Sequence, residues 1–107
     1  MAYMVKQANP AAATPADLYA VPASKQAVIS TLAVCEHNDV ATRYRVLIRP
    51  AGASAADVHR LVYDAPVAGL DTTFLTVGIA LGTGDVVTVE AATDDVTFTA
   101  FVNETEV

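Results

Sequence analysis

Apolar and polar residues alternate along most of this chain with a period of two residues. Such alternation is typical of β-strands that bury one face, because successive side chains point to opposite sides of the strand. It is clearest in residues 42–49. One face there consists of Tyr44, Val46 and Ile48, and the other of Arg43, Arg45, Leu47 and Arg49. We therefore expect a half-buried strand with a basic outer face.

Turn-forming residues divide the chain into about eight such segments, and strands spaced in this way are typical of a sandwich or a barrel. The expected strands cover residues 3–8, 17–21, 26–36, 42–49, 59–64, 72–81, 86–91 and 96–104. We expect an all-β protein, namely an antiparallel β-sandwich with a jelly-roll-like topology. A seven-stranded immunoglobulin-like sandwich is the alternative, although the Cys…Trp…Cys spacing of immunoglobulin domains is absent.

Three local patterns add detail to this plan. In residues 26–36 both alternating faces are largely apolar, which predicts a central strand with Val28, Ser30, Leu32 and Val34 on one side. Residues 66–69 contain both Pro and Gly and predict a loop. Gly78 lies inside an expected strand, where glycine often marks a bulge or a close backbone approach.

The N-terminal segment differs from the rest of the chain. Pro10 and Pro15 exclude a regular helix or a central strand over residues 9–16. We therefore divide the chain into an N-terminal strand and arm, residues 1–16, and a β-sandwich domain, residues 17–107. An extended arm can add to the sheet edge of a neighbouring molecule. On this hypothesis Tyr3, Met4 and Val5 contact a partner.

Charge is unevenly distributed along the chain. The net charge is −6, and all six Lys and Arg residues lie within residues 1–60. Residues 61–107 contain eight acidic and no basic residues. This asymmetry favours complementary surfaces, within one subunit or between neighbours. The overall acidity argues against direct nucleic-acid binding. We also expect no membrane contact and no secretory leader, because no segment has the required pattern.

Few residues suggest chemistry. Cys35 and His37 share a strand face, and His59 with Glu36 would complete a metal cluster on paper. Glu36 points to the opposite face, however, and the ligand spacings of known zinc sites are absent. A Cys–His nucleophile would need an orienting group and oxyanion donors, which no pattern marks. We expect a buried Cys35, no cofactor, no metal and no enzymatic activity.

The basic stripe formed by Arg43, Arg45 and Arg49 has two interpretations that the sequence leaves open. It is either the solvated face of an antiparallel strand or a contact surface, since Arg is enriched at interfaces and binds carboxylates through two hydrogen bonds. The acidic second half of a neighbouring copy, or an acidic partner, would then be what it meets.

Several strand and turn sequences carry a resemblance to a known group of proteins. They are Asp17-Leu-Tyr-Ala-Val-Pro-Ala23, Ala27–Cys35, Tyr44-Arg-Val-Leu-Ile-Arg-Pro-Ala-Gly52, Asp71-Thr-Thr-Phe74 and Gly84-Asp-Val-Val-Thr-Val89. Together they resemble small β-sandwich virion proteins of tailed bacteriophages, which are capsid decoration (cement) proteins or tail components. The resemblance implies a non-enzymatic structural role on the capsid surface, homotrimers, contact with the major capsid protein, and assembly in the host cytoplasm.

Two other functions remain as alternatives. A tail, baseplate or receptor-binding adaptor module would share the fold, but exposed aromatic residues at loop tips would be expected of a receptor binder. A carbohydrate-binding or cupin-like jelly roll is the third interpretation. A cupin-like metal site needs several inward-facing His residues and a carboxylate, and the chain has only two His.

Overall fold

The computed structural model describes residues 2–107, and this part of the chain is built almost entirely of strands. The strands are β1 (Ala2–Ala8), β2 (Ala16–Ala20), β3 (Lys25–Glu36), β4 (Thr42–Arg49), β5 (Arg60–Val67), β6 (Thr72–Leu75), β7 (Ile79–Leu81), β8 (Val86–Ala91) and β9 (Val96–Glu106). Two short 3-10 turns, η1 (Pro50–Gly52) and η2 (Asp57–His59), lie between β4 and β5. Residues 2–107 contain no helix of the length and apolarity that crossing a membrane requires.

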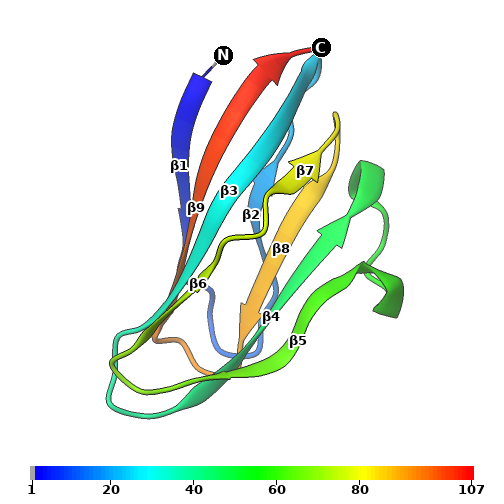
Figure 1. Ribbon diagram of the computed structural model, residues 1–107. Coiled ribbons are helices and arrows are strands. Elements are labelled where there is room, and N and C mark those ends of the chain that lie inside the picture. The colour runs from blue at the N-terminus through cyan, green and yellow to red at the C-terminus, as the bar shows by residue number, and fades with distance from the viewer. Residues whose placement is uncertain (1) are drawn as a thin grey trace.

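The strands form two sheets that pack face to face (Figure 1). One sheet has the order β1-β9-β3-β6, with β7 also pairing with β3, and the other has the order β2-β8-β4-β5. Every pairing is antiparallel. The chain crosses between the sheets at most of its connections, which is how a jelly roll wraps. The predicted antiparallel, jelly-roll-like β-sandwich is confirmed.

The structure has nine strands where the sequence predicted about eight, because the segment 72–81 is interrupted. Gly78 has a φ of +63°, a conformation that glycine adopts without steric cost. The break separates β6, which pairs with Leu32–Cys35, from β7, which pairs with Ala27–Ile29. Both segments pair with β3, so together they take the place of one strand at that edge of the sheet.

Strand β5 extends further than predicted, since it continues through Pro66 to Val67. Pro66 pairs with Arg43 at the outer edge of the β2-β8-β4-β5 sheet. Proline is tolerated on an edge strand because the missing N–H faces away from the sheet. The prediction that residues 66–69 form a loop was therefore wrong for Pro66 and Val67.

A β-bulge in β3 changes which of its residues face the core. Ile29 pairs with Val102 but Thr31 pairs with Phe101, so Ser30 is an extra residue in β3. Before the bulge Ala27 and Ile29 are buried, and after it the buried residues are Leu32, Val34 and Glu36. The prediction that Val28 shares a face with Leu32 and Val34 was wrong, because strict alternation does not continue through a bulge.

The core lies between the two sheets and is rich in valine. Phe98 of β9 is fully buried, and its ring meets the ring of Tyr44 of β4 edge to face, with centroids 6.1 Å apart. This contact joins the two sheets. Other core residues include Leu18, Ile29, Leu32, Val34, Val46, Val67, Val87, Val89, Val96, Ala100 and Val102. Each Val, Leu, Ile and Phe side chain among them contributes about 1.5–3 kcal/mol by leaving water.

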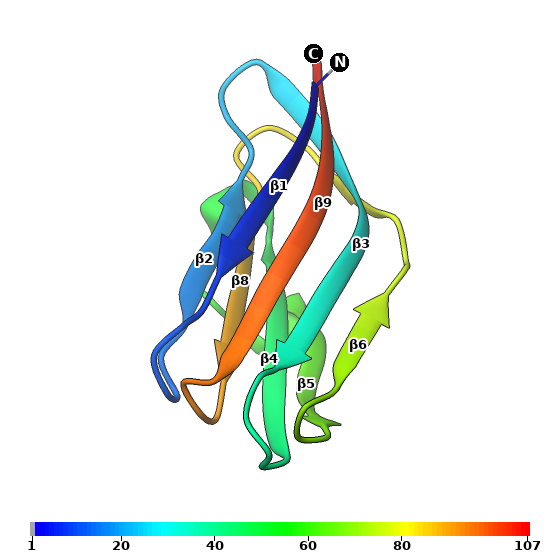
Figure 2. The ribbon, with the colours of Figure 1, turned by 90° about the vertical axis from the view of Figure 1, so that its left-hand side faces the viewer.

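The N-terminal strand belongs to the sandwich. β1 pairs with β9 along its length, from Ala2 opposite Glu104 to Ala8 opposite Phe98. The loop that follows is attached to the same body, since the N–H of Ala13 donates to the carbonyl of Ala91 at 2.8 Å. The boundary at residue 16 that we drew from the sequence therefore separates β1 from the sheet to which it belongs. Figure 2 shows β1 at the edge of that sheet.

Candidate docking face

Among residues 2–107, one broad surface carries no charged side chain at its outward-facing strand positions. It is the outer side of the β1-β9-β3-β6 sheet, which faces the viewer in Figure 2 and which we call the outer face. The strand pairing and the burial pattern assign the following residues to it: Tyr3, Val5, Gln7, Gln26, Val28, Ser30, Thr31, Ala33, Cys35, Thr72, Phe74, Ala80, Thr97, Thr99, Phe101, Asn103 and Thr105.

The charged residues of these strands point the other way. Glu36 and Glu104 are buried on the inner side of the sheet, and Lys6 shares that side with Met4 and Ala8, which pack against the core. Because successive side chains of β1 and β9 point to opposite sides of the sheet, the charged residues lie on the inner side and the outer face has none. In a protein with a net charge of −6, the result is a wide uncharged surface.

Large apolar side chains are exposed on the outer face. The exposed fractions of Tyr3, Phe74 and Phe101 are 79%, 64% and 43%. Val5 and Val28 are also about half exposed. Single exposed apolar residues are ordinary, but a cluster of them on one face marks an interaction surface.

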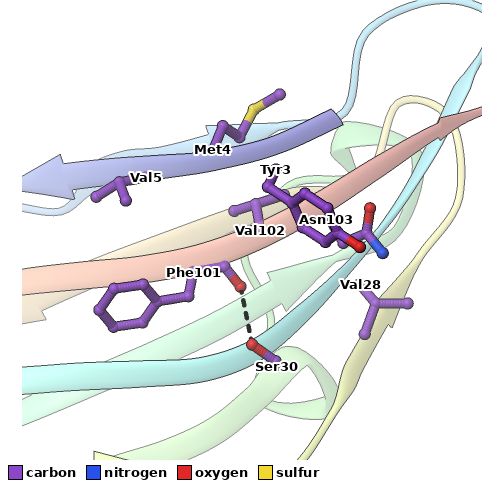
Figure 3. A pocket seen from close by; sticks show the side chains of 8 residues that line it. All are labelled: Tyr3, Met4, Val5, Val28, Ser30, Phe101, Val102 and Asn103. Carbon is purple, nitrogen blue, oxygen red and sulfur yellow. Dashed lines mark hydrogen bonds between the residues drawn. The ribbon is translucent and has the colours of Figure 1, made fainter. Parts of the chain in front are cut away.

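A hollow of about 590 Å³ lies on this face between the N-terminal part of β1 and the bulged part of β3. Figure 3 shows its lining, with the Tyr3 ring beside Asn103, the Phe101 ring further along β9, and Val28 beyond Asn103. Its polar groups come from Ser30 and Asn103. Most of the lining is apolar, which suits an apolar side chain better than a charged ligand.

The bulge shapes the floor of this hollow. Ser30 and Thr31 both lie on the outer side of β3, and the Ser30 hydroxyl donates to the backbone carbonyl of Phe101 at 3.4 Å (Figure 3). A bulge bends its strand and increases its twist, so the sheet is not flat at this point. Asn103 Oδ1 is shielded from solvent and has no hydrogen-bond partner among residues 2–107, which leaves an acceptor unsatisfied.

The basic stripe lies on the opposite side of the molecule, on the outer side of the β2-β8-β4-β5 sheet. Arg45 binds Asp64 through two hydrogen bonds of 2.7 and 3.3 Å, and Glu90 lies 3.8 Å from its guanidinium group. The hydrogen bond from Arg45 lowers the pKa of Asp64 below its ordinary value. The ring of Tyr63 stacks on Arg45, with 4.5 Å from the guanidinium carbon to the ring centre.

The other two arginines of the stripe are also engaged within the chain. Arg49 donates to the Thr88 hydroxyl at 3.0 Å and to Asp17 at 3.2 Å. Arg43 donates to the backbone carbonyl of Asp64 at 2.8 Å. Arg45 thus meets acidic residues of the second half of its own chain, and Arg49 meets Asp17 of the first half. Two of the three arginines of the stripe, Arg45 and Arg49, bind carboxylates of the same subunit, and Arg43 binds a backbone carbonyl.

The interface residues predicted from the sequence therefore do not form one site. Tyr3 and Val5 lie on the outer face, Met4 points inward and packs against the core, and the stripe lies on the other sheet. Sequence reasoning did not single out Phe74 and Phe101. The sequence signal for Phe101 is the uncharged, Thr-rich alternate positions of residues 97–105.

The residues considered for a metal site are dispersed. Cys35 is half-buried on the outer face, which corrects the prediction that it is buried, and Glu36 points into the core. His59 lies in η2, where its Nδ1 accepts from the N–H of Ala56 at 3.1 Å. Within residues 2–107, no group of three or more His, Cys, Asp or Glu side chains is arranged to hold a metal ion.

One buried acid has an unusual environment at the end of the sandwich. Glu36 is 1% exposed, and its Oε1 accepts from the N–H of Asn38 at 2.9 Å. Its Oε2 receives no hydrogen bond from any donor among residues 2–107. Burial raises the pKa of Glu36, and the neighbouring Asp95, whose pKa is lowered by the Thr93 hydroxyl, can accept its proton in a hydrogen bond.

No protein-family model, curated protein or solved structure matches this chain. The geometry of the described residues is therefore the basis of the functional argument. Two surfaces contrast: an arginine stripe in which Arg45 and Arg49 bind carboxylates of the same chain, and an outer face with exposed aromatic rings and no charged side chain at its described strand positions. The outer face offers these rings and the unsatisfied Asn103 Oδ1 to a partner.

Proposed function

We propose that this chain is a non-enzymatic structural protein of a bacteriophage virion, and specifically a capsid decoration (cement) protein that binds between major capsid subunits. The outer face is the observation that carries this proposal. Its exposed rings, Tyr3, Phe74 and Phe101, lie on a surface without charge. Depletion of charge and enrichment of aromatic residues distinguish the centres of protein interfaces from ordinary surface.

The jelly-roll fold supports a structural role in a particle. A sandwich of two sheets holds a broad face in fixed shape, so little order has to be gained when a partner binds. A protein that binds only the assembled shell stabilises the shell against disassembly. Copies joined into a trimer, as the resemblance implies, would contact several shell sites at once and bind with higher avidity.

Co-sedimentation with shells tests the proposal. Purified protein is mixed with mature shells and, separately, with isolated tails of a tailed phage that encodes this chain, and each particle is pelleted. Decoration predicts near-stoichiometric occupancy of shells and a higher temperature of shell disruption. Pelleting with tails alone would assign the chain to the tail or baseplate instead. Binding to neither particle would contradict a virion role.

A further inference from the structure

We infer that the outer face joins copies of this chain to one another, so that its occupant is a second copy. The inference rests on the proposed function in one respect: the face that supports an assembly role is assigned here to a second copy, so contact with the capsid falls to the remaining surface of the oligomer. The area of the face and the shapes present on it support this occupant, and its lack of charge permits it.

Charge permits a second copy at this face. Each copy carries a net charge of −6, so two copies repel, and the repulsion is weakest when they meet through a face that keeps charged side chains away from the contact. The outer sides of the two sheets differ in this respect. If two copies met through the side with Arg45 and Asp64, side chains of like charge would face each other in many arrangements. Contact through the outer face brings no charged side chains together.

The exposed area is of the size that a stable contact needs. A fully exposed aromatic side chain offers about 150–250 Å². At the exposed fractions of 79%, 64% and 43%, Tyr3, Phe74 and Phe101 together offer about 370 Å². A standard interface buries about 800 Å² per partner, so the rings supply nearly half of it. Val5, Val28 and the surrounding Thr side chains extend the same surface.

The face also contains a projection and a recess. Phe74 projects from β6 and is not part of the hollow that Phe101 and Tyr3 line. Phe74 pairs with Ala33, two residues beyond Thr31, which pairs with Phe101. Strand spacings place the Cα atoms of Phe74 and Phe101 about 12 Å apart along the face. The Phe74 ring of one copy can enter the hollow of a neighbouring copy, a contact of projection with recess that closes into a ring when it repeats around a symmetry axis.

The edge of the same sheet is a less suitable place for copies to join. β1 is an edge strand, and addition of a second β1 would form a continuous sheet. Lys6 lies on the inward side of β1 and is exposed. A charge at such a position of an edge strand opposes pairing with another strand. The face, and not the edge, is thus the contact surface.

Mass measurement by light scattering across a concentration series tests the inference with matched variants. Phe101→Asp places a carboxylate on the outer face, and Leu61→Asp makes the same kind of change on β5 of the other sheet. The exposed fractions of the two side chains are similar, 43% and 46%. We expect wild type and Leu61→Asp to form the same oligomer, and Phe101→Asp to associate at least about tenfold more weakly.

A second substitution and a fold check keep the result interpretable. Phe74→Asp should weaken association as Phe101→Asp does, with far-UV circular dichroism and melting temperature showing that each variant is folded. The inference would be overturned if the wild-type protein stays monomeric up to about 100 µM. It would also be overturned if both substitutions leave the mass of the oligomer unchanged. An oligomer that does not bind shells would contradict the proposed function but not this inference. A monomer that binds shells would contradict this inference but not the proposed function.

Discussion

Arg45 and Asp64 form an ion pair with two hydrogen bonds, of 2.7 and 3.3 Å, between neighbouring strands β4 and β5. From the sequence, the basic first half and the acidic second half of the chain could pair within one subunit or between neighbours. The Arg45–Asp64 pair joins the two halves within one subunit. The arginine stripe therefore has internal partners, and the outer face of the other sheet is left as the candidate surface.

The first prediction concerns this pair. Arg45→Gln should lower the midpoint of urea unfolding only slightly, since exposed ion pairs contribute little and are screened by salt. The difference from wild type should shrink further in about 1 M NaCl, where screening is nearly complete. Oligomer mass and shell occupancy should not change. A loss of shell binding on Arg45→Gln in a folded variant would show that the stripe is a contact surface.

The second prediction compares two phenylalanines of β9 that point to opposite sides. Phe98 is fully buried and contacts Tyr44, whereas Phe101 lies on the outer face. Phe98→Ala should reduce the free energy of unfolding by about 3–5 kcal/mol through lost burial and a cavity. Phe101→Ala should reduce it by less than about 1 kcal/mol in the monomer. Urea titrations at low protein concentration measure both; equal losses would contradict the assigned faces.

The third prediction concerns the bulge. Deleting Ser30 removes the extra residue, so that Ile29 opposite Val102 and Thr31 opposite Phe101 become consecutive pairs and the buried residues on both sides keep their faces. Deleting Ala33, in the regular part of the same strand, reverses the faces on one side of the deletion, because one residue exchanges the two faces of a strand. We expect the Ala33 deletion to lower the free energy of unfolding by about 2–5 kcal/mol, comparable to removing a core side chain, and the Ser30 deletion to lower it much less. Urea unfolding of both variants measures the difference, and a Ser30 deletion as destabilising as the Ala33 deletion would contradict the bulge.

The fourth prediction is a pH dependence caused by Glu36. Its folded-state pKa is raised above the ordinary value of 4.5 by burial. As the pH rises above about 4.5, the unfolded chain releases this proton before the folded protein does, so the folded state loses stability. Glu36→Gln keeps a donor toward Asp95 and removes the titration. The stability of Glu36→Gln relative to wild type should therefore increase between about pH 4.5 and pH 8.

Urea unfolding of both proteins across that pH range gives the comparison. Because only the difference between them is used, the titration of all other groups cancels to first order. Parallel curves would show that Glu36 has the same pKa in the folded and the unfolded chain, and would contradict the prediction.

Much of the fold could be predicted from the alternation of residue types. The bounds of β4 and β8 were predicted as they occur, since both strands alternate without interruption between clear turn residues. The errors lie where one residue breaks the period: Ser30 at the bulge, Gly78 between β6 and β7, and Pro66 in an edge strand. Such irregularities depend on the pairing strand, which a single strand's sequence does not contain.

The candidate site was less predictable for a related reason. A face is assembled from β1, β3, β6 and β9, which are distant in the chain, so its lack of charge becomes visible only when the strand order is known. The arginine stripe attracted attention because it lies within one strand. Its acidic partners, Asp64 and Glu90, come from β5 and β8.

The reactivity of Cys35 offers the most direct test of the docking face. It is the single cysteine of the chain and lies half-buried on the outer face. Its alkylation rate by iodoacetamide can be measured in dilute monomer and in the oligomer. We predict a rate at least about tenfold lower when the face is occupied, because alkylation needs access to the thiolate. An unchanged rate in a species that light scattering shows to be an oligomer would contradict the account.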